Sequence, residues 1–289
     1  MRVAVTGSAG FIGAAVVARL RAEGHDVLAL SRREWDITTP REPERVDAVV
    51  HCAALADDWA PLAEAMRVNR DGTANVVAAF PGARIVHISS SSVYDAFTPT
   101  VHAVETEPLP TRWLSGYSES KAAAETLLDS RAVILRPHAV YGPGDTTLLP
   151  RILAAVHKDR LFLPERAWVP HTVTHIHNLV DAVVLALEGT ASGVFNVGDD
   201  GDVILGEMVI ELLDRQGWAQ VAVHSIPYGV AFAAAVGLEA WHRVSGGRPA
   251  LTRYAVSQLG LERTLDLAKA RRELGYRPRP TSLAGAESW

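Results

Sequence analysis

A glycine-rich turn near the N-terminus constrains the fold of this 289-residue chain more than any other feature. The segment 6–13, TGSAGFIG, follows a short apolar strand and opens a stretch, 11–22, with apolar residues at helical spacing. Gly7 permits a tight turn, Gly10 lets backbone approach a phosphate, and Gly13 lets a helix pack closely on a sheet. Helix N-terminal amides attract anions, so we expect the turn to bind a dinucleotide pyrophosphate, although its glycine spacing is unusual. The residues expected to hold it are Gly7, Gly10, Phe11, Ile12 and Gly13.

Short apolar strands alternate with helical segments through the first half of the chain. Apolar strands separated by helices indicate a parallel sheet covered on both faces. The predicted fold class is therefore α/β, with a doubly wound parallel sheet of the Rossmann type. Strands are predicted at 3–6, 25–30, 47–52, 84–88 and 132–135, and helices at 11–22, 62–79 and 115–128.

The pattern loosens in the second half. A strand at 172–176, a helix at 178–187 and a strand at 194–197 continue the alternation, and the remaining chain is mainly helical. We expect two units. Residues 1–140, with 172–197 returning to them, form a dinucleotide-binding domain, and residues 141–171 and 198–289 form a smaller, mainly helical substrate-binding lobe.

Composition and charge restrict the partners. The formal net charge of −5 argues against a nucleic-acid partner. The chain has a single cysteine, Cys52, so it cannot form an intramolecular disulfide. This cysteine content, together with an N-terminus that lacks a signal-peptide pattern, favours a cytoplasmic location. The apolar run 227–238 is shorter than the roughly 20 residues that span a bilayer, so no integral membrane segment is expected. It is interpreted as a buried helix, a pocket wall or a surface that touches a membrane. A small-molecule substrate is the expected partner, and a homodimer is one assembly open to such a chain.

The end of the second predicted strand addresses the choice of cofactor. Domains that bind NAD commonly place an acid there, where it holds the ribose hydroxyl. This chain has Ser31, Arg32 and Arg33 instead. Guanidinium groups match phosphate geometry with paired donors, which favours the 2′-phosphate of NADP. NAD bound beside a solvated basic loop is the alternative.

A tyrosine and a lysine four residues apart form the candidate catalytic pair. Tyr117 and Lys121 share one face of the predicted helix 115–128. A free phenol has a pKa of about 10, and a nearby positive charge lowers it. The pair gains weight from the serine run 89–92 at the end of a sheet strand, because ligands bind at the carboxyl ends of such strands.

These motifs resemble those of a known superfamily along nearly the whole chain. The TGxxGFIG turn, HCAA at 51–54, the Ser-Ser-x-x-Val-Tyr stretch ending at Tyr94, the Tyr117/Lys121 pair and Arg136-Pro137 resemble the extended short-chain dehydrogenase/reductase superfamily, the NAD-dependent epimerase/dehydratases. The resemblance implies that Ser90 hydrogen-bonds the substrate oxygen, Tyr117 transfers the proton and Lys121 holds the nicotinamide ribose. It also implies cofactor contacts at Asp36, Ile37, Ala53, Ala54, Asn69, Tyr117, Lys121, Pro137, His138, Ala139 and Val140.

Several stretches resemble the 3β-hydroxysteroid dehydrogenase-like branch in particular. They are ALADDW at 54–59, LRPHAVYGPGD at 135–145, and LTRY at 251–254 followed by 270–278. That branch oxidises or reduces a secondary alcohol or ketone on sterol-like or β-keto substrates, so a small, apolar substrate is expected. The residues expected to contact it are Asp57, Trp59, Ser91, Tyr141 and His171.

Three functions follow from these residues, of which the first is preferred. It is hydride transfer between NADP and a carbonyl or alcohol carbon, with Tyr117 as the general acid. A nucleotide-sugar epimerase or dehydratase is the alternative, although dehydratases of the superfamily carry Asp-Glu where this chain has Ser91-Ser92. A non-catalytic NADP-binding regulator comes last, because such proteins typically lose the tyrosine or lysine. No metal site is expected at His171, His175 and His177, which lack a local acid or cysteine.

Overall fold

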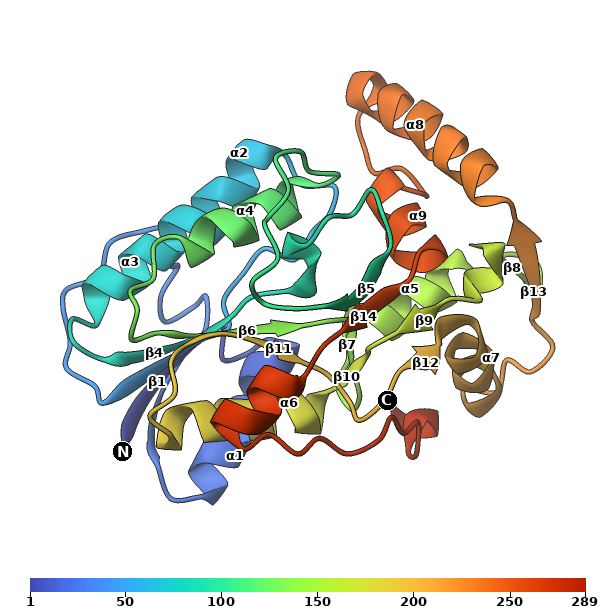
Figure 1. Cartoon of the computed structure of the whole chain (residues 1–289). Coiled ribbons are helices and arrows are strands. Elements are labelled where there is room, and N and C mark those ends of the chain that lie inside the picture. The colour runs from blue at the N-terminus through green and yellow to red at the C-terminus, as the bar shows by residue number, and fades with distance from the viewer.

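A six-stranded parallel sheet forms the centre of the first half of the molecule (Figure 1). The computed structural model describes all residues, 1–289. The strands follow the order β11-β6-β4-β3-β1-β2, and every neighbouring pair is parallel. This confirms the predicted α/β class. The strands are β1 (Arg2–Thr6), β2 (Asp26–Leu30), β3 (Ala48–His51), β4 (Arg84–Ile88), β6 (Val133–Pro137) and β11 (Gly193–Val197).

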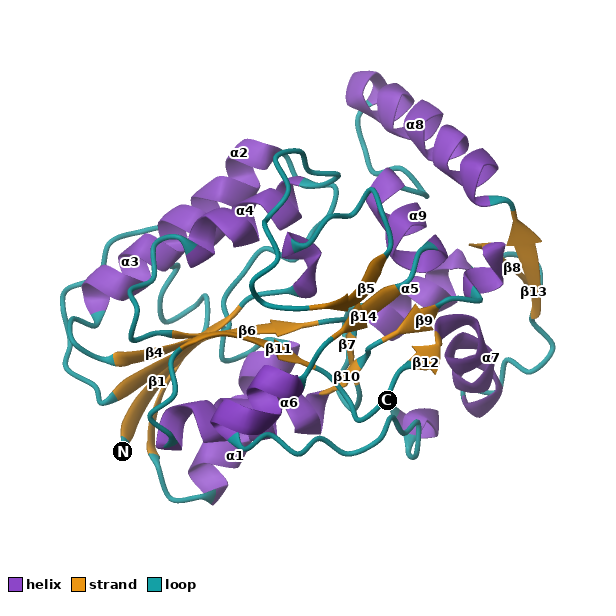
Figure 2. Cartoon of the chain, in the orientation of Figure 1, coloured by secondary structure: helices purple, strands orange, loops and turns teal.

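Helices cover both faces of this sheet (Figure 2). Alternate residues of a strand point to opposite faces. Val3 and Val5 accordingly pack in the core on the side of α1 and α6, whereas Ala4 packs with Val76 and Phe80 on the other side. The helices are α1 (Phe11–Ala22) and α6 (Ile176–Glu188) on one face, and α2 (Leu62–Ala65), a π-helical segment (Met66–Asp71), α3 (Gly72–Ala79) and α4 (Gly116–Glu125) on the other.

The second half contains more strand than the sequence pattern indicated. A four-stranded sheet, β12-β9-β14-β5, and two pairs, β10-β7 and β13-β8, lie among its helices. These strands are two to five residues long, too short for periodicity to reveal. They are β5 (Thr100–Ala103), β7 (Val140–Tyr141), β8 (Arg160–Pro164), β9 (Pro170–His171), β10 (Thr174–His175), β12 (Val203–Ile204), β13 (Ala222–Ile226) and β14 (Arg263–Leu265). The helices are α5 (Leu148–Ala155), α7 (Leu205–Arg215), α8 (Tyr228–Ser245) and α9 (Arg253–Gly260).

A fully buried carboxylate joins the two halves. Asp199 accepts hydrogen bonds from Tyr141 Oη, from the backbone amide of His175 and from Asn178 Nδ2, each at 2.7 Å. A buried charge is stable only where hydrogen bonds compensate it. The three donors come from β7, β10 and α6, so Asp199 fixes the second half against the central sheet.

The apolar run 227–238 begins α8, and the interpretation as a buried helix is wrong. Only Ala231, Ala235 and Glu239 of this helix are buried. In Figure 1, α8 projects from the body of the molecule. No helix of the chain is both long enough and apolar enough to cross a bilayer.

Candidate active site

The glycine-rich turn forms a tight backbone cradle between β1 and α1. Gly7 has φ +67°, and a Cβ on it would lie 2.7 Å from the amide nitrogen of Ala53. A Cβ on Gly13 would lie 2.2 Å from the carbonyl oxygen of Gly7. Both contacts are too short for any side chain, so glycine is required at each position. The cradle also brings the turn against Ala53 and Ala54, which are predicted cofactor contacts.

The cradle offers free donors to an anion. The amides of Phe11, Ile12 and Gly13 have no protein acceptor, and the first turn of α1 contains no acidic residue. Unpaired amides at a helix N-terminus bind phosphate groups. These residues therefore fit a dinucleotide pyrophosphate, as the sequence predicts.

Two exposed arginines follow β2 at the edge of the sheet. The Arg32 side chain is 85% exposed, with Nε 3.4 Å from Asp36 Oδ2. The acid beside Ser31 is Glu34. Its carboxylate accepts hydrogen bonds from the Ser31 amide and hydroxyl, which lower the pKa of Glu34. Glu34 is thus already engaged. Arg33 is exposed and has no ion pair, and the exposed Arg32 pairs only with Asp36, so both guanidinium groups are accessible to an anion. Ile37 of the predicted adenine pair is buried against α3.

Tyr117 and Ser90 lie together at the carboxyl end of β4. Ser115 accepts a hydrogen bond from the Ser118 amide, which starts α4 and places Tyr117 in its first turn. Burial raises the pKa of Tyr117, whereas a hydrogen bond from Ser90 and the positive charge of Arg151 lower it. Both residues are half-buried, so they are accessible and surrounded by protein. The structure brings together the predicted proton donor and the predicted carbonyl ligand.

Lys121 lies on the same helix as Tyr117, with its ammonium at the end of β4. Its Nζ donates to the Ile88 carbonyl oxygen at 2.7 Å and lies 3.3 Å from His87 Nε2. Burial lowers the pKa of Lys121 to about 8. The hydrogen bond to the Ile88 carbonyl oxygen holds the ammonium at the end of β4. The positive charge of Arg151, on α5, lowers the pKa of Tyr117.

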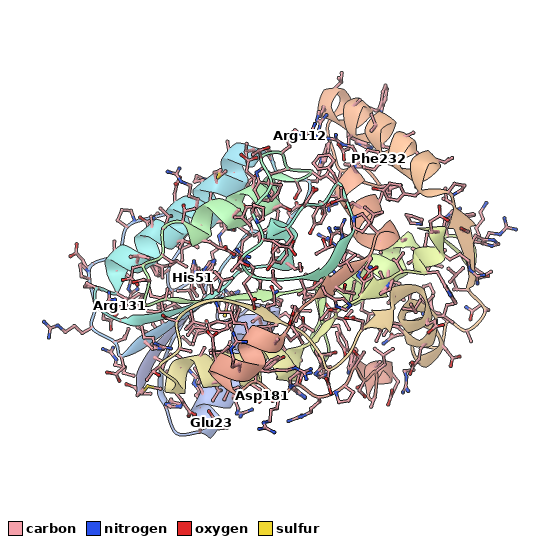
Figure 3. All side chains as sticks on the ribbon, viewed as in Figure 1. Glu23, His51, Arg112, Arg131, Asp181 and Phe232 are labelled. Carbon is pink, nitrogen blue, oxygen red and sulfur yellow. The ribbon has the colours of Figure 1, made fainter.

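A hydrogen-bonded chain beneath the turn connects β1 to the π-helical segment. Thr6 Oγ1 lies 2.7 Å from His51 Nδ1, and His51 Nε2 lies 3.0 Å from Thr73 Oγ1, which donates to the Asn69 carbonyl oxygen. Burial lowers the pKa of His51 to about 3, so its ring is neutral. Figure 3 shows His51 in the interior of the molecule. The chain is consistent with one tautomer, protonated on Nε2.

Asn69, a predicted cofactor contact, is buried between the 53–55 loop and α4. Its Nδ2 donates to Ser120 Oγ at 2.8 Å and to the Leu55 carbonyl oxygen at 3.1 Å, while its Oδ1 accepts from the Leu55 amide at 2.7 Å. Every polar atom of the side chain is therefore paired. The asparagine joins the 53–55 loop to α4 and so holds the helix that carries Tyr117.

The serine after Ser90 contacts a pair of buried histidines. Ser91 Oγ lies 2.8 Å from His138 Nδ1, and His138 Nε2 lies 3.0 Å from His171 Nδ1. Ala139 has a φ of +43°, so the backbone turns between Pro137 and Val140. The neighbouring His138 side chain is buried. His171 is 1% exposed. It therefore does not line an open pocket as predicted, and reaches the site only through His138.

The other predicted substrate contacts divide into two groups. Asp57 and Trp59 are half-buried and lie on the loop after β3. Tyr141 is 2% exposed and donates its hydroxyl to Asp199, so its polar atom is already paired. The three histidines examined as a metal site do not converge, since His171 stacks on His138 and His175 packs edge-on against Tyr141.

Two residues of the second half approach the site and were missed in the sequence. Burial and the charges of Tyr117 and Asp58 raise the pKa of Tyr254, which places this phenol beside the catalytic one. Arg248 binds Asp57 and Asp58, the latter at 2.6 Å. Both lie within or beside the LTRY stretch, whose resemblance to the family was the only available signal.

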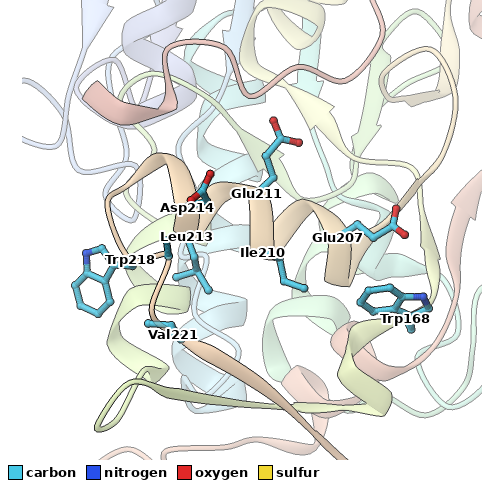
Figure 4. A pocket seen from close by; sticks show the side chains of 9 residues that line it. Trp168, Glu207, Ile210, Glu211, Leu213, Asp214, Trp218 and Val221 are labelled. Atoms are coloured by element: carbon cyan, nitrogen blue, oxygen red, sulfur yellow. The ribbon is translucent and has the colours of Figure 1, made fainter.

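A surface groove in the second half is lined by other residues than these (Figure 4). It lies along α7, between Trp168 and Trp218, with Ile210 on its floor. None of the predicted site residues lines it. The groove therefore offers no support for the assignment of the active site.

Comparison with known proteins identifies the family. A model of the NAD dependent epimerase/dehydratase family matches residues 3–198. The whole chain is 33% identical to 95% of the 4-hydroxy-2-methyl-3-oxo-4-farnesyl-3,4-dihydroquinoline-1-oxide ketoreductase of Stigmatella aurantiaca. Over 94% of its length it is 29% identical to the 2-alkyl-3-oxoalkanoate reductase of Shewanella oneidensis, of which 81% is covered.

Solved structures share the fold. MoeE5 in complex with UDP-glucose and NAD superimposes with a TM-score of 0.72 and 25% identity, over 99% of this chain and 96% of that one. RMD from Pseudomonas aeruginosa complexed with NADPH gives a TM-score of 0.70 and 21% identity, over 99% and 95%. The chain belongs to the NAD-dependent epimerase/dehydratase family, within the extended short-chain dehydrogenase/reductases, and is an NAD(P)-dependent oxidoreductase.

Proposed function

We propose that this enzyme is an NADP-dependent reductase that converts the ketone of a small, apolar 3-oxo compound to a secondary alcohol. The observation that carries the proposal is the placement of Tyr117 in the first turn of α4, half-buried beside Ser90 at the carboxyl end of β4, where Ser90 lowers the pKa of the phenol. The two relatives described above support the substrate class, because their names specify a 3-oxo group beside a farnesyl or alkyl substituent.

The protein residues supply orientation and one proton. NADPH held by the glycine-rich turn would supply a hydride for the carbonyl carbon, and Tyr117 is the residue that would donate its phenolic proton to the carbonyl oxygen. Ser90 hydrogen-bonds that oxygen as negative charge develops on it. Ser90 and Arg151 then stabilise the phenolate, since both lower the pKa of Tyr117. Lys121, held on Ile88, is positioned for the nicotinamide ribose.

The preference for NADP over NAD depends on the residues after β2. Arg32 and Arg33 are exposed, and the only carboxylate beside Ser31 is already hydrogen-bonded. Guanidinium groups recognise a phosphate with paired donors. The 2′-phosphate of NADP is therefore the group that this edge of the sheet fits.

NADPH consumption tests the proposal directly. The purified enzyme is given NADPH or NADH with 3-oxo compounds of increasing alkyl chain length, and absorbance at the nicotinamide band is followed. We expect turnover with NADPH that rises with chain length, and loss of turnover in Tyr117→Phe with cofactor binding retained. Full activity of Tyr117→Phe would contradict the assignment.

A nucleotide-sugar epimerase or dehydratase is the second candidate. The structure of MoeE5 with UDP-glucose and NAD favours it, since this chain shares that fold over nearly its whole length. An epimerase regenerates its cofactor within each cycle. Conversion of a sugar nucleotide without net NADPH oxidation would therefore support it, and stoichiometric NADPH oxidation supports the reductase. Loss of both activities would leave the non-catalytic regulator.

The division into units and the cellular context belong to the same proposal. Residues 1–140 with 172–197 are proposed as the cofactor domain, supported by the return of β11 to the central sheet. Residues 141–171 and 198–289 are proposed as the substrate lobe, although β5 pairs with β14 and so joins the lobe sheet. A cytoplasmic location and a homodimer complete the proposal; fractionation and sedimentation velocity measure them.

A further inference from the structure

Helix α8 presents an apolar face to solvent. Val230, Trp241 and Val244 are 60%, 66% and 89% exposed, although apolar side chains of this size normally lie in a core. Positions three and four residues apart share one face of a helix. The exposed apolar residues of α8 follow this spacing along its length: Gly229, Val230, Ala233, Ala234, Val236, Gly237, Ala240, Trp241 and Val244.

The exposed charged side chains at the C-terminal end of this helix are positive. Between Gly229 and Val244, Arg243 is the only exposed residue that is not apolar. Its side chain is 60% exposed, whereas its partner Glu239 is 4% exposed. Arg248, in the loop that follows, is 46% exposed, and its partner Asp58 is 4% exposed. Two cations therefore lie at the C-terminal end of the apolar face. The acids Glu239 and Asp58 are buried beneath them, and Asp57, which also pairs with Arg248, is 37% exposed. This excess of exposed positive charge is complementary to an anionic surface.

The size of the face argues against a second copy of the chain. An 18-residue helix is about 27 Å long and about 10 Å wide, so one face offers roughly 300 Å². A stable protein dimer buries about 800 Å² on each partner. A bilayer surface requires only that one apolar face enter it, with Trp at the boundary between apolar and polar layers.

The loop after α8 contacts the proposed substrate side of the site. Trp59 Nε1 donates to the Gly247 carbonyl oxygen at 2.9 Å, and Arg243 lies over the Trp59 ring, 5.8 Å from its centroid. Thr252 at the start of α9 donates to Asp58 at 2.6 Å, and Tyr254 follows beside Tyr117. The exposed helix is thus connected to the residues that approach the catalytic tyrosine.

We propose that α8 lies in the surface of an anionic lipid bilayer and that the enzyme takes its ketone substrate from that bilayer. The part concerning the substrate rests on the proposed reductase function, whereas membrane binding does not. Trp241 and Val244 enter the acyl boundary, and Arg243 and Arg248 contact lipid phosphates. The reactive end of the site then opens toward the layer in which an apolar ketone concentrates.

A fluorophore attached at Val244→Cys tests the binding. Cys52 is the only native cysteine, and burial raises its pKa to about 12, so it reacts slowly with thiol reagents. The labelled protein is mixed with phosphatidylglycerol or phosphatidylcholine vesicles. We expect a blue shift with phosphatidylglycerol that weakens in high salt. The matched control is the same label at Val101→Cys, a 58% exposed position on β5, where no shift is expected.

Three results would overturn the proposal. The first is no fluorescence shift at position 244 with phosphatidylglycerol, and the second is an equal shift at position 101. The third is a shift without vesicles that grows with protein concentration, which would assign the face to a second copy of the chain.

Turnover measurements separate the membrane proposal from the reductase proposal. Val244→Glu should keep NADPH oxidation with a short, water-soluble ketone and lose the stimulation by vesicles that contain a long-chain ketone. Absence of all NADPH oxidation would instead contradict the reductase function while vesicle binding still reports on α8.

Discussion

Ser91 Oγ lies 2.8 Å from His138 Nδ1, one residue beyond the serine that contacts Tyr117. Burial lowers the pKa of His138 to about 3, so the ring is neutral near pH 7. With His138 neutral and hydrogen-bonded to His171, the ring fixes the Ser91 hydroxyl beside the reacting groups. A substrate that hydrogen-bonds Ser91 therefore meets a fixed partner.

Removal of His138 should consequently affect substrate binding more than proton transfer. For His138→Ala we expect KM for the ketone to rise about 10-fold, because the loss of one hydrogen bond costs about 1.4 kcal/mol. The value of kcat should change less. The pH dependence of kcat should match that of the native enzyme, because a neutral His138 donates no proton. A shifted pH profile would instead make this histidine part of the acid–base chemistry.

Four buried histidines should make the protein unstable in acid. Burial lowers the pKa of His51 and His138 to about 3, and those of His87 and His171 well below the usual value. The unfolded chain takes up protons below about pH 6.5, and the native rings do not until the pH is far lower. The four neutral rings therefore contribute their full share to the free energy of unfolding above about pH 6.5. Below that pH the free energy of unfolding falls by up to about 1.4 kcal/mol per pH unit for each ring.

Urea unfolding at pH 7, 6 and 5 measures this loss. We expect His51→Gln to reduce the slope of stability against pH, because one depressed group is removed. The exposed His157 provides the control, and His157→Gln should leave the slope unchanged. A slope that is identical in both variants would show that His51 is not neutral in the folded protein.

The cation beside Tyr117 should matter for the reverse reaction. Arg151 lowers the pKa of Tyr117, so Arg151→Gln should raise it. In alcohol oxidation the phenolate accepts the proton, so the pH at which this rate reaches half its maximum should move upward. The shift should shrink in high salt, since the guanidinium is half-exposed and screened. Arg160→Gln, an exposed change on β8, should leave the pH profile unchanged.

For Tyr117→Phe, the variant that removes the proposed proton donor, we expect a loss of about 100- to 10,000-fold in kcat.

Replacement of the arginines after β2 should change the choice of cofactor. For the double variant Arg32→Ala, Arg33→Ala, we expect KM for NADPH to rise by about 10- to 100-fold, because a charge-assisted hydrogen bond contributes about 1.5–3 kcal/mol. KM for NADH should change little, since that cofactor lacks the 2′-phosphate. Equal effects on both cofactors would contradict recognition of the 2′-phosphate.

A buried ion pair under the catalytic loop should dominate the stability of this region. Arg136 Nη2 lies 2.6 Å from Glu125 Oε2, both side chains are less than 8% exposed, and Ser89 Oγ donates to Glu125 at 2.5 Å. Loss of one partner leaves a buried charge unpaired, so Arg136→Met should lower the free energy of unfolding by about 3–5 kcal/mol. Adding Glu125→Leu should recover part of this loss. Additive losses in urea denaturation would show that the two charges are not coupled.

Much of the cofactor half could be predicted because its signals are local. The glycine turn, the apolar strands and the helix from Gly116 depend on spacing within a few residues. The orientation of Lys121 could not be predicted, because it depends on the carbonyl oxygen of Ile88, 33 positions away. The same applies to Arg151 and Tyr254, which reach Tyr117 only through the packing of the second half.

The second half shows where sequence patterns mislead. Tyr141 is polar and adjacent to a family motif, yet its hydroxyl serves a buried carboxylate. The run 227–238 has the composition of a core helix, and composition cannot distinguish a core from an exposed apolar face. Only the positions of α9 and the 246–253 loop, both fixed by tertiary contacts, show which side of α8 remains uncovered.

The pairing of β5 with β14 has a consequence for protein engineering. The strand Thr100–Ala103 lies within the first half of the chain but forms the edge of a sheet built from the second half. Exchange of the substrate-recognition region between relatives at a boundary near residue 140 would leave this edge strand behind with mismatched side chains. A chimera that carries residues 95–105 together with the second half keeps the sheet intact and is expected to fold where the simpler exchange fails.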